Sequence, residues 1–171
     1  MASAEVIIAN IAPAIDSISI TPAITYTNDI IQAQATTSDG DGDSVSVSYQ
    51  WFVDGNMVYD GGDTLDGNLY FDKGQEVYVI VTPSDGVAEG SPVQSNVIAV
   101  QNSLPVITSV TVSPDPAVLN TDELVCSVMA TDADGDSIVY TYEWSDTNVV
   151  QKTVTEITDV SNKLAVDELT A

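Results

Sequence analysis

The sequence predicts an all-β protein built from antiparallel β-sandwich units, and three observations lead to this prediction. Apolar and polar residues alternate over short runs such as Val45 to Trp51, and a period of two residues is typical of a strand with one buried face. Clusters of Gly, Asp, Asn and Pro, which favour turns, separate these runs. No stretch has helical periodicity. Many short strands joined by turns are typical of a β-sandwich.

The strands are assigned in chain order from this alternation. After a short apolar strand at residues 5–9, the first repeat is expected to hold seven strands, at about residues 15–20, 29–36, 45–53, 56–60, 68–71, 76–82 and 95–101. The second repeat begins in the same way, with strands expected at residues 107–112, 124–130 and 138–144. Trp51 and Trp144 end equivalent runs 93 residues apart, so we expect both side chains to be buried as the core anchors of two similar units.

Two copies of one linker place the unit boundaries. Asn10 begins a four-residue linker that ends in proline, and Asn102 begins a second such linker at an offset of 92 residues. Glu5 to Ala9 precede the first linker as Val97 to Gln101 precede the second. The predicted organisation is an orphan strand, equivalent to the last strand of a repeat, at residues 1–10, a first sandwich at residues 11–102 and an incomplete second sandwich at residues 103–171.

The second unit is shorter than the first. Residues 163–167 align with residues 68–72, with Leu164 matching Leu69, so residues 77–100 have no counterpart and the last two strands of the sandwich are expected to be missing. An incomplete sandwich exposes an apolar face and an open edge. Two explanations stay open: the chain is cut from a longer array, or another molecule completes the unit.

Each repeat contains an acidic loop that is a candidate calcium site. Three aspartates stand at alternate positions in each loop: Asp39, Asp41 and Asp43 in the first, and Asp132, Asp134 and Asp136 in the second. Calcium binds six to eight oxygen ligands and needs negative charge to offset its dehydration. The loops are not EF-hands, because serine stands where glycine is required and strands flank the loop. The alternative is that Asp and Gly simply form turns.

Further ligands are expected at the same end of each sandwich. If the strands run alternately up and down, the loop that carries Asp85 lies at the end of the first acidic loop. The linker before each unit reaches this end as well, so Asn10 and Asn102 can add oxygen ligands. We therefore predict Ca2+ as the bound ion, with Asp85 and Asn102 as secondary ligands.

Composition and charge disfavour several functions. Lys and Arg total 3 against 26 Asp and Glu, a formal charge of −23, which makes nucleic acid and anionic membranes poor partners. No apolar run is long enough to insert into a membrane. Histidine is absent, so the commonest general base is missing and we expect no enzyme. A solvated acidic surface without a bound cation is the alternative explanation of the charge.

The composition favours an extracellular or cell-surface location. Thr, Ser, Val, Asp and Gly are abundant, and runs rich in Lys, Arg or Glu are missing. The first residues have neither the basic region nor the apolar core of a secretory signal. Either the signal lies outside this chain, or the protein reaches the outside without one, as virion proteins do.

Several short motifs of the chain belong together: Asn102-x-x-Pro105, Val112 to Pro116, Ala130 to Asp136, Tyr140 to Trp144 and, in the first unit, Val81 to Gly86. In combination they resemble the PKD-type and cadherin-like branch of immunoglobulin-like repeats found in bacterial and archaeal surface proteins. The resemblance implies tandem immunoglobulin-like antiparallel β-sandwich domains that calcium stabilises and that serve as stalks, adhesins or fibre subunits rather than as catalysts.

The same resemblance raises the question of a disulfide, because such repeats often pair a cysteine in the second strand with one in the sixth. Cys126 holds the second-strand position, whereas the first unit has Ala33 there. Three interpretations stay open for Cys126: a small apolar core side chain, a reactive thiol, or a cysteine whose partner lies beyond Ala171.

The function expected from the residues and the resemblance is a non-catalytic, calcium-stabilised structural or adhesive module of an extracellular fibre, stalk or surface layer. One alternative is a carbohydrate-binding module, in which Tyr26, Tyr59, Tyr70 and Tyr78 would stack on sugar rings. Another is a virion surface or decoration protein. The expected partners are copies of the same chain or neighbouring repeats and, for the first alternative, a glycan.

Strand donation between copies is a further prediction. Glu5 to Ala9 resemble a last strand with no place in their own repeat, and the second unit lacks its last strand, so donation would build an open head-to-tail fibre. Donation requires Lys163 to Thr170 to act as the sixth strand of the second unit, with Val149 to Val160 covering the intervening positions. The match of Leu164 with Leu69 argues against this requirement, and truncation of a longer array is the alternative.

Overall fold

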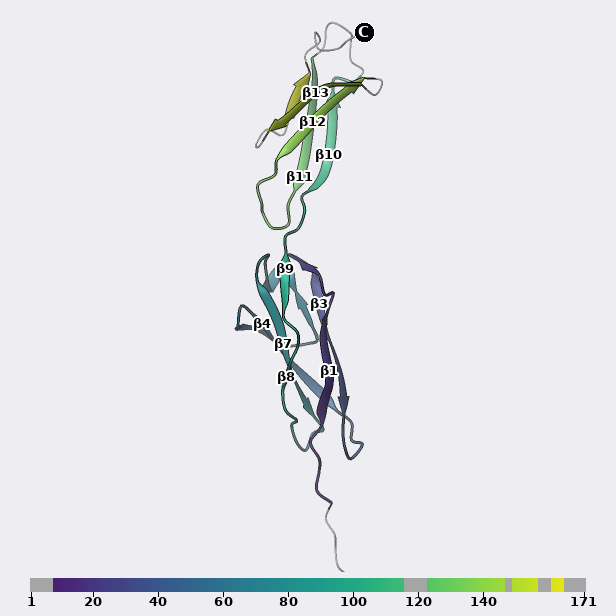
Figure 1. Ribbon diagram of the computed structural model, residues 1–171, viewed down its shortest axis with the longest axis vertical. Coiled ribbons are helices and arrows are strands. Elements are labelled where there is room, and N and C mark those ends of the chain that lie inside the picture. Colours follow the sequence, from purple (N-terminus) through teal and green to yellow (C-terminus); the bar gives the residue numbers. More distant parts are fainter. Residues whose placement is uncertain (1–7, 116–122, 147–148, 157–160, 165–171) are drawn as a thin grey trace, which may run out of the picture. The chain divides into compact units, whose positions relative to one another are not determined.

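The protein is described here from a computed structural model that covers residues 8–115, 123–146, 149–156 and 161–164 (Figure 1). The chain divides into two compact units, Met1–Asn102 and Ser103–Ala171, which we call unit 1 and unit 2. Within the described residues both units consist of strands, and the only helix is a single turn, α1 (Gly67–Tyr70). These residues contain no helix with the length and apolar character that crossing a lipid bilayer requires. The fold is therefore all-β.

Unit 1 contains two sheets. The first has three antiparallel strands in the order β1-β3-β6: β1 (Ala14–Thr21), β3 (Ile30–Ser38) and β6 (Thr64–Asp66). The second has the order β2-β9-β7-β4-β5, with β8 beside β7: β2 (Thr25–Tyr26), β4 (Ser46–Val53), β5 (Asn56–Gly61), β7 (Glu76–Ser84), β8 (Val93–Gln94) and β9 (Ile98–Gln101). Among the described strands, β2 and β9 are the one pair that runs in parallel.

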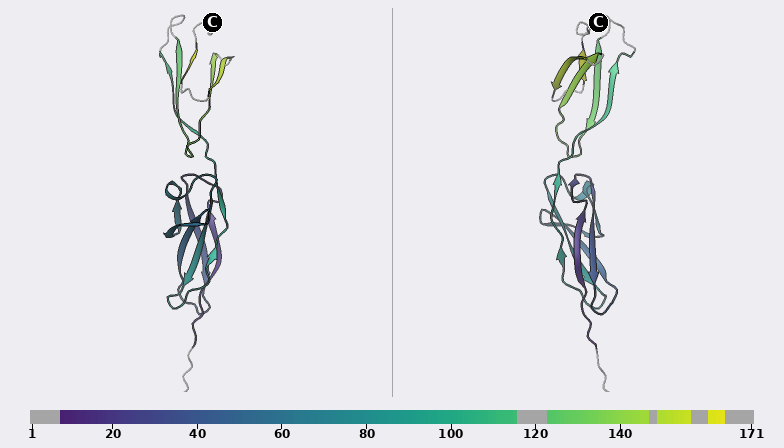
Figure 2. Two further views of the ribbon diagram at one scale, coloured as in Figure 1. Left: turned by 90° about the vertical axis from the view of Figure 1, so that its left-hand side faces the viewer. Right: turned by 45° about the vertical axis from the view of Figure 1, so that its right-hand side comes forward.

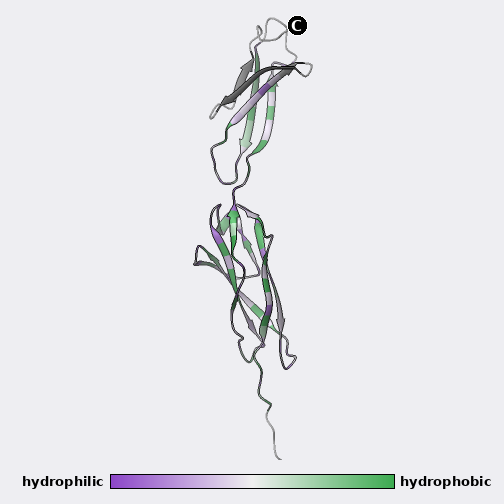
Figure 3. Cartoon of the chain, viewed as in Figure 1, coloured by the Kyte–Doolittle hydropathy of each residue, from purple (hydrophilic) through white to green (hydrophobic). Residues whose placement is uncertain are grey.

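The two sheets of unit 1 pack face to face on one apolar core, as Figure 2 shows from two sides. Trp51 on β4 is 0% exposed and belongs to the same buried cluster as Ile31 and Leu65 of the opposite sheet. Its indole N–H donates a hydrogen bond of 3.1 Å to the carbonyl of Gly62, so burial leaves this polar group satisfied. The arrangement resembles a β-sandwich, and apolar residues alternate with polar ones along its strands (Figure 3).

Strand β7 closes the core beside Trp51. Val77, Val79 and Val81 are fully buried, and the residues between them are only half-buried, as the period of two predicts. Val79 lies directly opposite Trp51 in the antiparallel pairing of β7 with β4. The burial of Trp51 therefore depends on β7 as well as on the facing sheet.

The prediction of a strand at residues 68–71 is wrong, because this segment forms α1. The Asp66 carboxylate caps the turn by accepting a hydrogen bond of 2.9 Å from Asn68 N. Gly67 permits the turn, since an added Cβ would lie 2.8 Å from the carbonyl oxygen of Asp29. Phe71, directly after α1, is buried in the core. A turn that inserts one aromatic ring carries no strand or helix periodicity.

Three short strands of unit 1, β2, β6 and β8, are absent from the sequence prediction. Leu65 of β6 is buried and pairs with Ile31 of β3, but its neighbours Gly61 to Asp63 and Asp66 to Asn68 have the composition of turns. The remaining strands predicted for unit 1 are confirmed within a few residues of their ends. In the orphan strand predicted at residues 5–9, only Ile8 and Ala9 are described, and they are not in a strand.

Unit 2 repeats the opening of unit 1. Its described strands form two antiparallel sheets. The first has the order β10-β11-β14: β10 (Val106–Ser113), β11 (Leu124–Thr131) and β14 (Ser161–Leu164). The second consists of β12 (Tyr140–Asp146) and β13 (Val149–Glu156). The register of β10 on β11 shifts between Ile107 and Ser109, as that of β1 on β3 shifts between Ile15 and Ser17. The repeat therefore extends to the position of a β-bulge.

Strand β14 changes the alignment of the end of unit 2. Leu164 pairs with Leu124 of β11, as Leu65 pairs with Ile31 of β3 in unit 1. Leu164 therefore corresponds to Leu65 rather than to Leu69. Residues 163 and 164 belong to the counterpart of β6, so they do not act as the sixth strand that we required for strand donation. Residues 165–170 of that segment lie outside the described residues.

Trp144 is half-buried, so the prediction that it is buried like Trp51 is wrong. Both tryptophans stand at the same place, next to a register shift between the strand that carries them and the following strand. In unit 1 the sheet continues from β4 to β7, which covers Trp51. Among the described residues of unit 2, the sheet of β12 consists of β12 and β13.

This difference in burial predicts that replacing the two tryptophans lowers the free energy of unfolding by unequal amounts. Trp51→Ala should lower the free energy of unfolding of unit 1 by about 3–5 kcal/mol, because it leaves a cavity between two sheets. Trp144→Ala should cost unit 2 only about 1–2 kcal/mol, because less apolar surface returns to water. Urea denaturation followed by circular dichroism measures both losses. Equal losses would contradict the different burial of the two side chains.

Candidate metal centre

The first acidic loop brings its three aspartates together. Asp39, Asp41 and Asp43 each offer a carboxylate oxygen, and these oxygens lie within 4.8 Å of one another. The loop joins β3 to β4, and Asp41 and Asp43 are exposed while Asp39 is half-buried. An oxygen-only cluster of this size suits a hard divalent cation such as calcium or magnesium.

Backbone hydrogen bonds hold the loop in this shape. Asp39 Oδ1 accepts hydrogen bonds from the backbone N–H groups of Asp41, at 2.8 Å, and Asp43, at 3.1 Å. Gly42 has a φ of 84°, a left-handed conformation that lets the chain turn between the second and third aspartates. One oxygen of Asp39 thus organises the loop.

The other carboxylate oxygen of Asp39 gives the strongest indication that the loop binds a cation. Asp39 Oδ2 is buried, and no described residue donates a hydrogen bond to it. Leaving a buried acceptor unsatisfied costs about 1–3 kcal/mol, and more for a charged one. The three carboxylates also repel one another, by about 1 kcal/mol per pair in a water-like dielectric and about 3 kcal/mol at an effective dielectric of 20. A bound cation would remove both costs.

The linker before unit 1 is attached to this site. Ile11 N donates a hydrogen bond of 2.7 Å to Asp41 Oδ2, and Asn10 Nδ2 donates one of 2.9 Å to Asp85 Oδ2. Ile11 also packs against the loop, since a Cβ at Gly40 would lie 3.1 Å from its Cδ1. Asn10 and Ile11 therefore connect the acidic loop with the loop that carries Asp85. The structure places both loops at one end of unit 1, as the alternation of strand directions predicts.

Asp85 is itself held as a carboxylate. Its Oδ1 accepts hydrogen bonds of 2.7 Å from the backbone N–H groups of Ala88 and Val87. The bond from Ala88, followed by those from Asn10 and Val87, holds the pKa of Asp85 below its ordinary value. Its oxygens already have donors, so Asp85 differs from Asp39, whose Oδ2 has none among the described residues.

The second acidic loop repeats the geometry of the first. Asp132, Asp134 and Asp136 again offer oxygens within 4.8 Å of one another. Asp132 Oδ1 accepts from the backbone N–H groups of Asp134, at 2.9 Å, and Asp136, at 3.2 Å. Gly135 has a φ of 72°, matching Gly42. Ser103 N donates to Asp134 Oδ2, as Ile11 N does to Asp41 Oδ2. Two independent parts of the sequence thus form one arrangement.

The two secondary ligands proposed from the sequence have different surroundings. Asp85 lies at the linker end of unit 1, linked through Asn10 to the segment that reaches Asp41. Asn102 Oδ1 instead accepts a hydrogen bond of 3.2 Å from Lys73 Nζ within unit 1.

Sequence reasoning found the six aspartates but missed the backbone N–H groups of Ile11 and Ser103. Every residue except proline carries a backbone N–H group, so a residue that donates this hydrogen bond cannot be recognised from its type. The equivalent positions of these two residues after Asn10 and Asn102 are the one signal that was available.

The tyrosines suggested as a sugar-binding platform mostly pack against other rings. Tyr59 and Tyr70 pair at 5.5 Å between ring centroids, and both contact the core. Tyr78 stacks on Phe52 at 4.9 Å with an interplanar angle of 4°. Tyr26 is exposed and lines a shallow hollow with Ile24. The four side chains are thus divided among three places: Tyr59 with Tyr70, Tyr78 with Phe52, and Tyr26 beside Ile24.

Cys126 is half-buried and forms no disulfide. Its counterpart Ala33 is buried in unit 1, so the position faces the interior of the repeat in both units.

No family model matches the chain. A search of curated proteins found no significant match.

The hydrogen bonds to Asp85 predict a pH dependence for unit 1. A carboxyl group whose pKa is lower in the folded state stabilises that state above its unfolded pKa, and this contribution disappears as the pH falls through the folded value. Asp85→Asn should therefore destabilise unit 1 at neutral pH, and its difference from the wild type should shrink below roughly pH 4. Urea titrations at several pH values measure this difference, and Asn10→Ala should show a weaker form of the same effect. A difference that is constant with pH would contradict this role of Asp85.

Proposed function

We propose that the protein is a non-catalytic structural or adhesive module whose repeats are immunoglobulin-like β-sandwiches stabilised by calcium. The buried and unsatisfied Asp39 Oδ2, within a cluster of three carboxylates, is the observation that supports calcium binding most directly. The recurrence of the loop in both units supports a role in the repeat itself rather than in one specialised site.

The strand order of unit 1 supports the immunoglobulin-like assignment. Strands β1, β3 and β6 form one sheet, and the sheet that faces it runs β9-β7-β4-β5. After β1 the chain crosses to the second sheet, where β2 pairs in parallel with β9, the last strand. A buried tryptophan on the central strand β4 completes the features that this fold shares. The strands of unit 2 match the opening half of this plan.

Calcium would fasten the linker before each unit to the acidic loop of that unit. In unit 1 the cation ligands lie on the loop between β3 and β4, which is hydrogen-bonded to the preceding linker through Ile11. In unit 2 the equivalent loop holds Ser103. A cation at either loop therefore restrains the segment that leads into the unit, which is a useful property for a load-bearing or surface-exposed repeat.

A role in an extracellular fibre, stalk or surface layer follows from these properties, and a virion surface is the alternative setting. The excess of acidic residues suits an environment where millimolar calcium is available, since exposed clusters of this kind bind extracellular calcium at such concentrations. The packing of Tyr59 with Tyr70 and of Tyr78 with Phe52 favours this structural role over sugar binding, because rings that stack on one another offer less surface to a glycan.

Calcium should raise the thermal stability of both units. A cation that binds only the folded state adds about 2.7 kcal/mol when its free concentration is 100 times the dissociation constant. Melting should be followed with and without excess calcium at matched ionic strength, because a chain of charge −23 also gains from simple screening. Identical melting in calcium and in chelator would reject the site.

Variants separate specific binding from loss of charge. Asp39→Asn, Asp41→Asn and Asp43→Asn together should abolish the calcium response of unit 1 and leave that of unit 2. The matched control changes Asp60, Asp63 and Asp66 to asparagine, which removes the same charge outside the two clusters. Calorimetric titration should show one ion fewer for the first variant only. Equal loss in both variants would mean that the effect is general screening.

A further inference from the structure

The two outer faces of unit 1 differ in their chemistry. On the first sheet, the outward side chains that pair between β1 and β3 are hydroxyls and amides: Ser17 with Thr36, Ser19 with Gln34, and Thr21 with Gln32. Such side chains form hydrogen bonds with water, so this face needs no partner. On the second sheet, apolar side chains lie on the outer face of three neighbouring strands, β5, β4 and β7.

These apolar side chains form one patch, which we call the outer patch: Phe52, Met57, Tyr78 and Ile80. Phe52 on β4 lies directly opposite Met57 of β5 and Tyr78 of β7. Opposite residues of antiparallel strands have their side chains on the same face, and Ile80 shares this face because it is the second residue after Tyr78. The Phe52 and Tyr78 rings stack at 4.9 Å between their centroids, with an interplanar angle of 4°.

The core of unit 1 does not account for the outer patch. The buried cluster takes Trp51 from β4 and Val79 from β7, which point to the opposite side of the sheet, and among the described residues it contains no member of the patch. Met57 is 55% exposed, and the other three side chains are half-buried. Apolar side chains that gather on an outer face are typical of a contact surface.

The repeat itself does not require an aromatic ring at this place. The offset of 93 residues that relates the two tryptophans puts Ser145 at the position of Phe52 and Val150 at that of Met57. The pairing is the same in both units, since Ser145 pairs with Val150 as Phe52 pairs with Met57. The stacked ring of Phe52 is therefore a property of unit 1 and not of the repeat.

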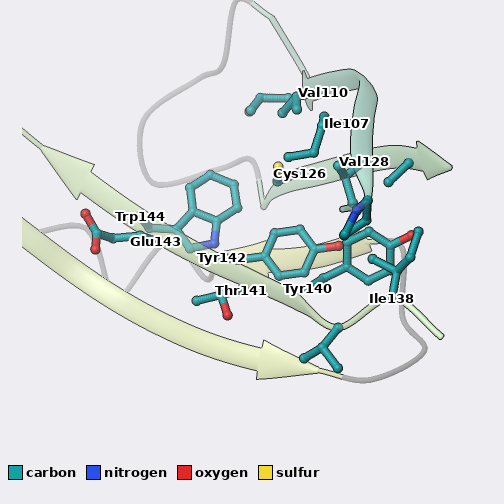
Figure 4. Close-up of a pocket in the computed structure, with 14 residues that line it drawn as sticks. Ile107, Val110, Cys126, Val128, Ile138, Tyr140, Thr141, Tyr142, Glu143 and Trp144 are labelled. Atoms are coloured by element: carbon teal, nitrogen blue, oxygen red, sulfur yellow. The ribbon is translucent and has the colours of Figure 1, made fainter. Parts of the chain in front are cut away.

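The outward side of the equivalent strand in unit 2 is polar. Figure 4 shows Tyr142 and Trp144 of β12 beside an apolar pocket that Cys126 also lines. Tyr142 is buried, whereas its neighbours Thr141 and Glu143 are exposed, so these two residues lie on the outer face of β12.

Acidic side chains border the outer patch on both sides. Glu76 comes two residues before Tyr78 on the same face of β7. Asp54, in the turn after β4, is its neighbour, because Asp54 Oδ1 accepts a hydrogen bond of 2.9 Å from Glu76 N. On the other side, Asp60 of β5 lies in the same cross-strand row as Ile80. All three acidic residues are exposed.

These charges decide which kind of partner suits the outer patch. Residues 1–102 contain a single basic side chain, Lys73, and the whole chain has a formal charge of −23. Lys73 donates a hydrogen bond to Asn102 Oδ1. A second copy of the chain, or any other acidic protein, would be repelled from the patch. A basic partner would be attracted over a distance and could pair with the bordering carboxylates on contact.

We propose that the outer patch of unit 1 binds a segment of another protein in which apolar side chains lie between Lys or Arg residues. The apolar side chains would cover Phe52, Met57 and Tyr78. The basic side chains would pair with Glu76 on one side of the patch and with Asp60 on the other. The patch is separate from the acidic loops, so this binding does not require calcium, and it goes beyond the calcium-stabilised structural role proposed above.

Two synthetic peptides of equal charge test whether the partner needs apolar side chains. The probe is KKVFVKK, and its control is KKSSSKK. Calorimetric titration of the full chain should show about tenfold or greater preference for the probe, because only the probe can bury the outer patch. Equal binding of the two peptides would mean that general charge attraction explains the contact, and it would overturn the proposal.

Substitutions without a change of charge locate the contact. Phe52→Ser with Met57→Ser should weaken binding of the probe by about tenfold or more, because an aromatic side chain and its neighbour are removed. Ile24→Ser with Leu69→Ser is the matched control, since both side chains are exposed elsewhere on unit 1. Equal weakening in the two variants, or none in the first, would overturn the proposal.

The fold of these variants is checked by circular dichroism. Unit 2 has serine at the position of Phe52, so we expect unit 1 to accept this residue as well. Met57→Ser alone changes an exposed side chain and replaces the double variant if that variant does not fold.

The role of the bordering carboxylates has its own pair of variants. Glu76→Gln with Asp60→Asn should weaken binding of the probe more than Asp16→Asn with Glu89→Gln, which removes the same charge from exposed residues outside the patch. Binding should also weaken as salt is added, because screening reduces the attraction between opposite charges. Equal effects of the two variants would contradict the position of the basic side chains.

Other occupants of the outer patch would give different results. If a second copy covers it, sedimentation should show an oligomer that Phe52→Ser with Met57→Ser disperses. If residues of the same chain cover it, the probe should bind no better than its control. Either result would overturn the proposal.

The titrations are carried out both in excess calcium and in chelator. Preference for the probe that depends on the outer patch, in a chain whose melting does not respond to calcium, would reject the calcium site alone. A calcium response without such a preference would reject this inference alone.

Discussion

The burial of Trp51 between two sheets is the interaction on which the rest of unit 1 depends. A Trp side chain removes roughly 150–250 Å² from water, worth about 4–6 kcal/mol at 25 cal/mol per Å². This gain needs cover from three directions: Ile31 and Leu65 on the facing sheet, β5 on one side of β4 and β7 on the other. The short elements of the unit serve this closure. Strand β6 places Leu65 in the core, and the turn α1 places Phe71 there.

The described residues of unit 2 show the same opening strands with less cover for the tryptophan. Its β10 and β11 keep the bulge of β1 and β3, and Trp144 keeps its place beside the second register shift. Local sequence is therefore sufficient to set the register of each pair. It is not sufficient to bury the tryptophan, because burial is a property of the neighbours. Trp144 is half-buried and Val112 is exposed, although both occupy core positions of the repeat.

This distinction also decides how much of the molecule could be predicted from the sequence. Strands with long alternation, such as β7, and loops that occur twice, such as that of Asp39 to Asp43, were predictable because their signal lies within a few residues. The turn α1 and the strand β6 were not, since each depends on one residue that fits a distant gap, Phe71 or Leu65. The backbone N–H donors of Ile11 and Ser103 could not be predicted either, because their role does not depend on the type of side chain. Contacts between residues far apart in the sequence determine all these features, and the periodicity of a short segment does not reveal such contacts.

The acidic loop and the preceding segment form one coupled system. Asp41 accepts a hydrogen bond from Ile11, and residues 5–9 lie directly before Asn10 and Ile11. A cation at Asp39, Asp41 and Asp43 would hold Asp41 in place and with it Ile11, so cation binding would restrain the linker before unit 1. The coupling is reciprocal: if cation binding orders the linker, a linker that is already ordered raises the affinity of the loop for the cation by the same factor.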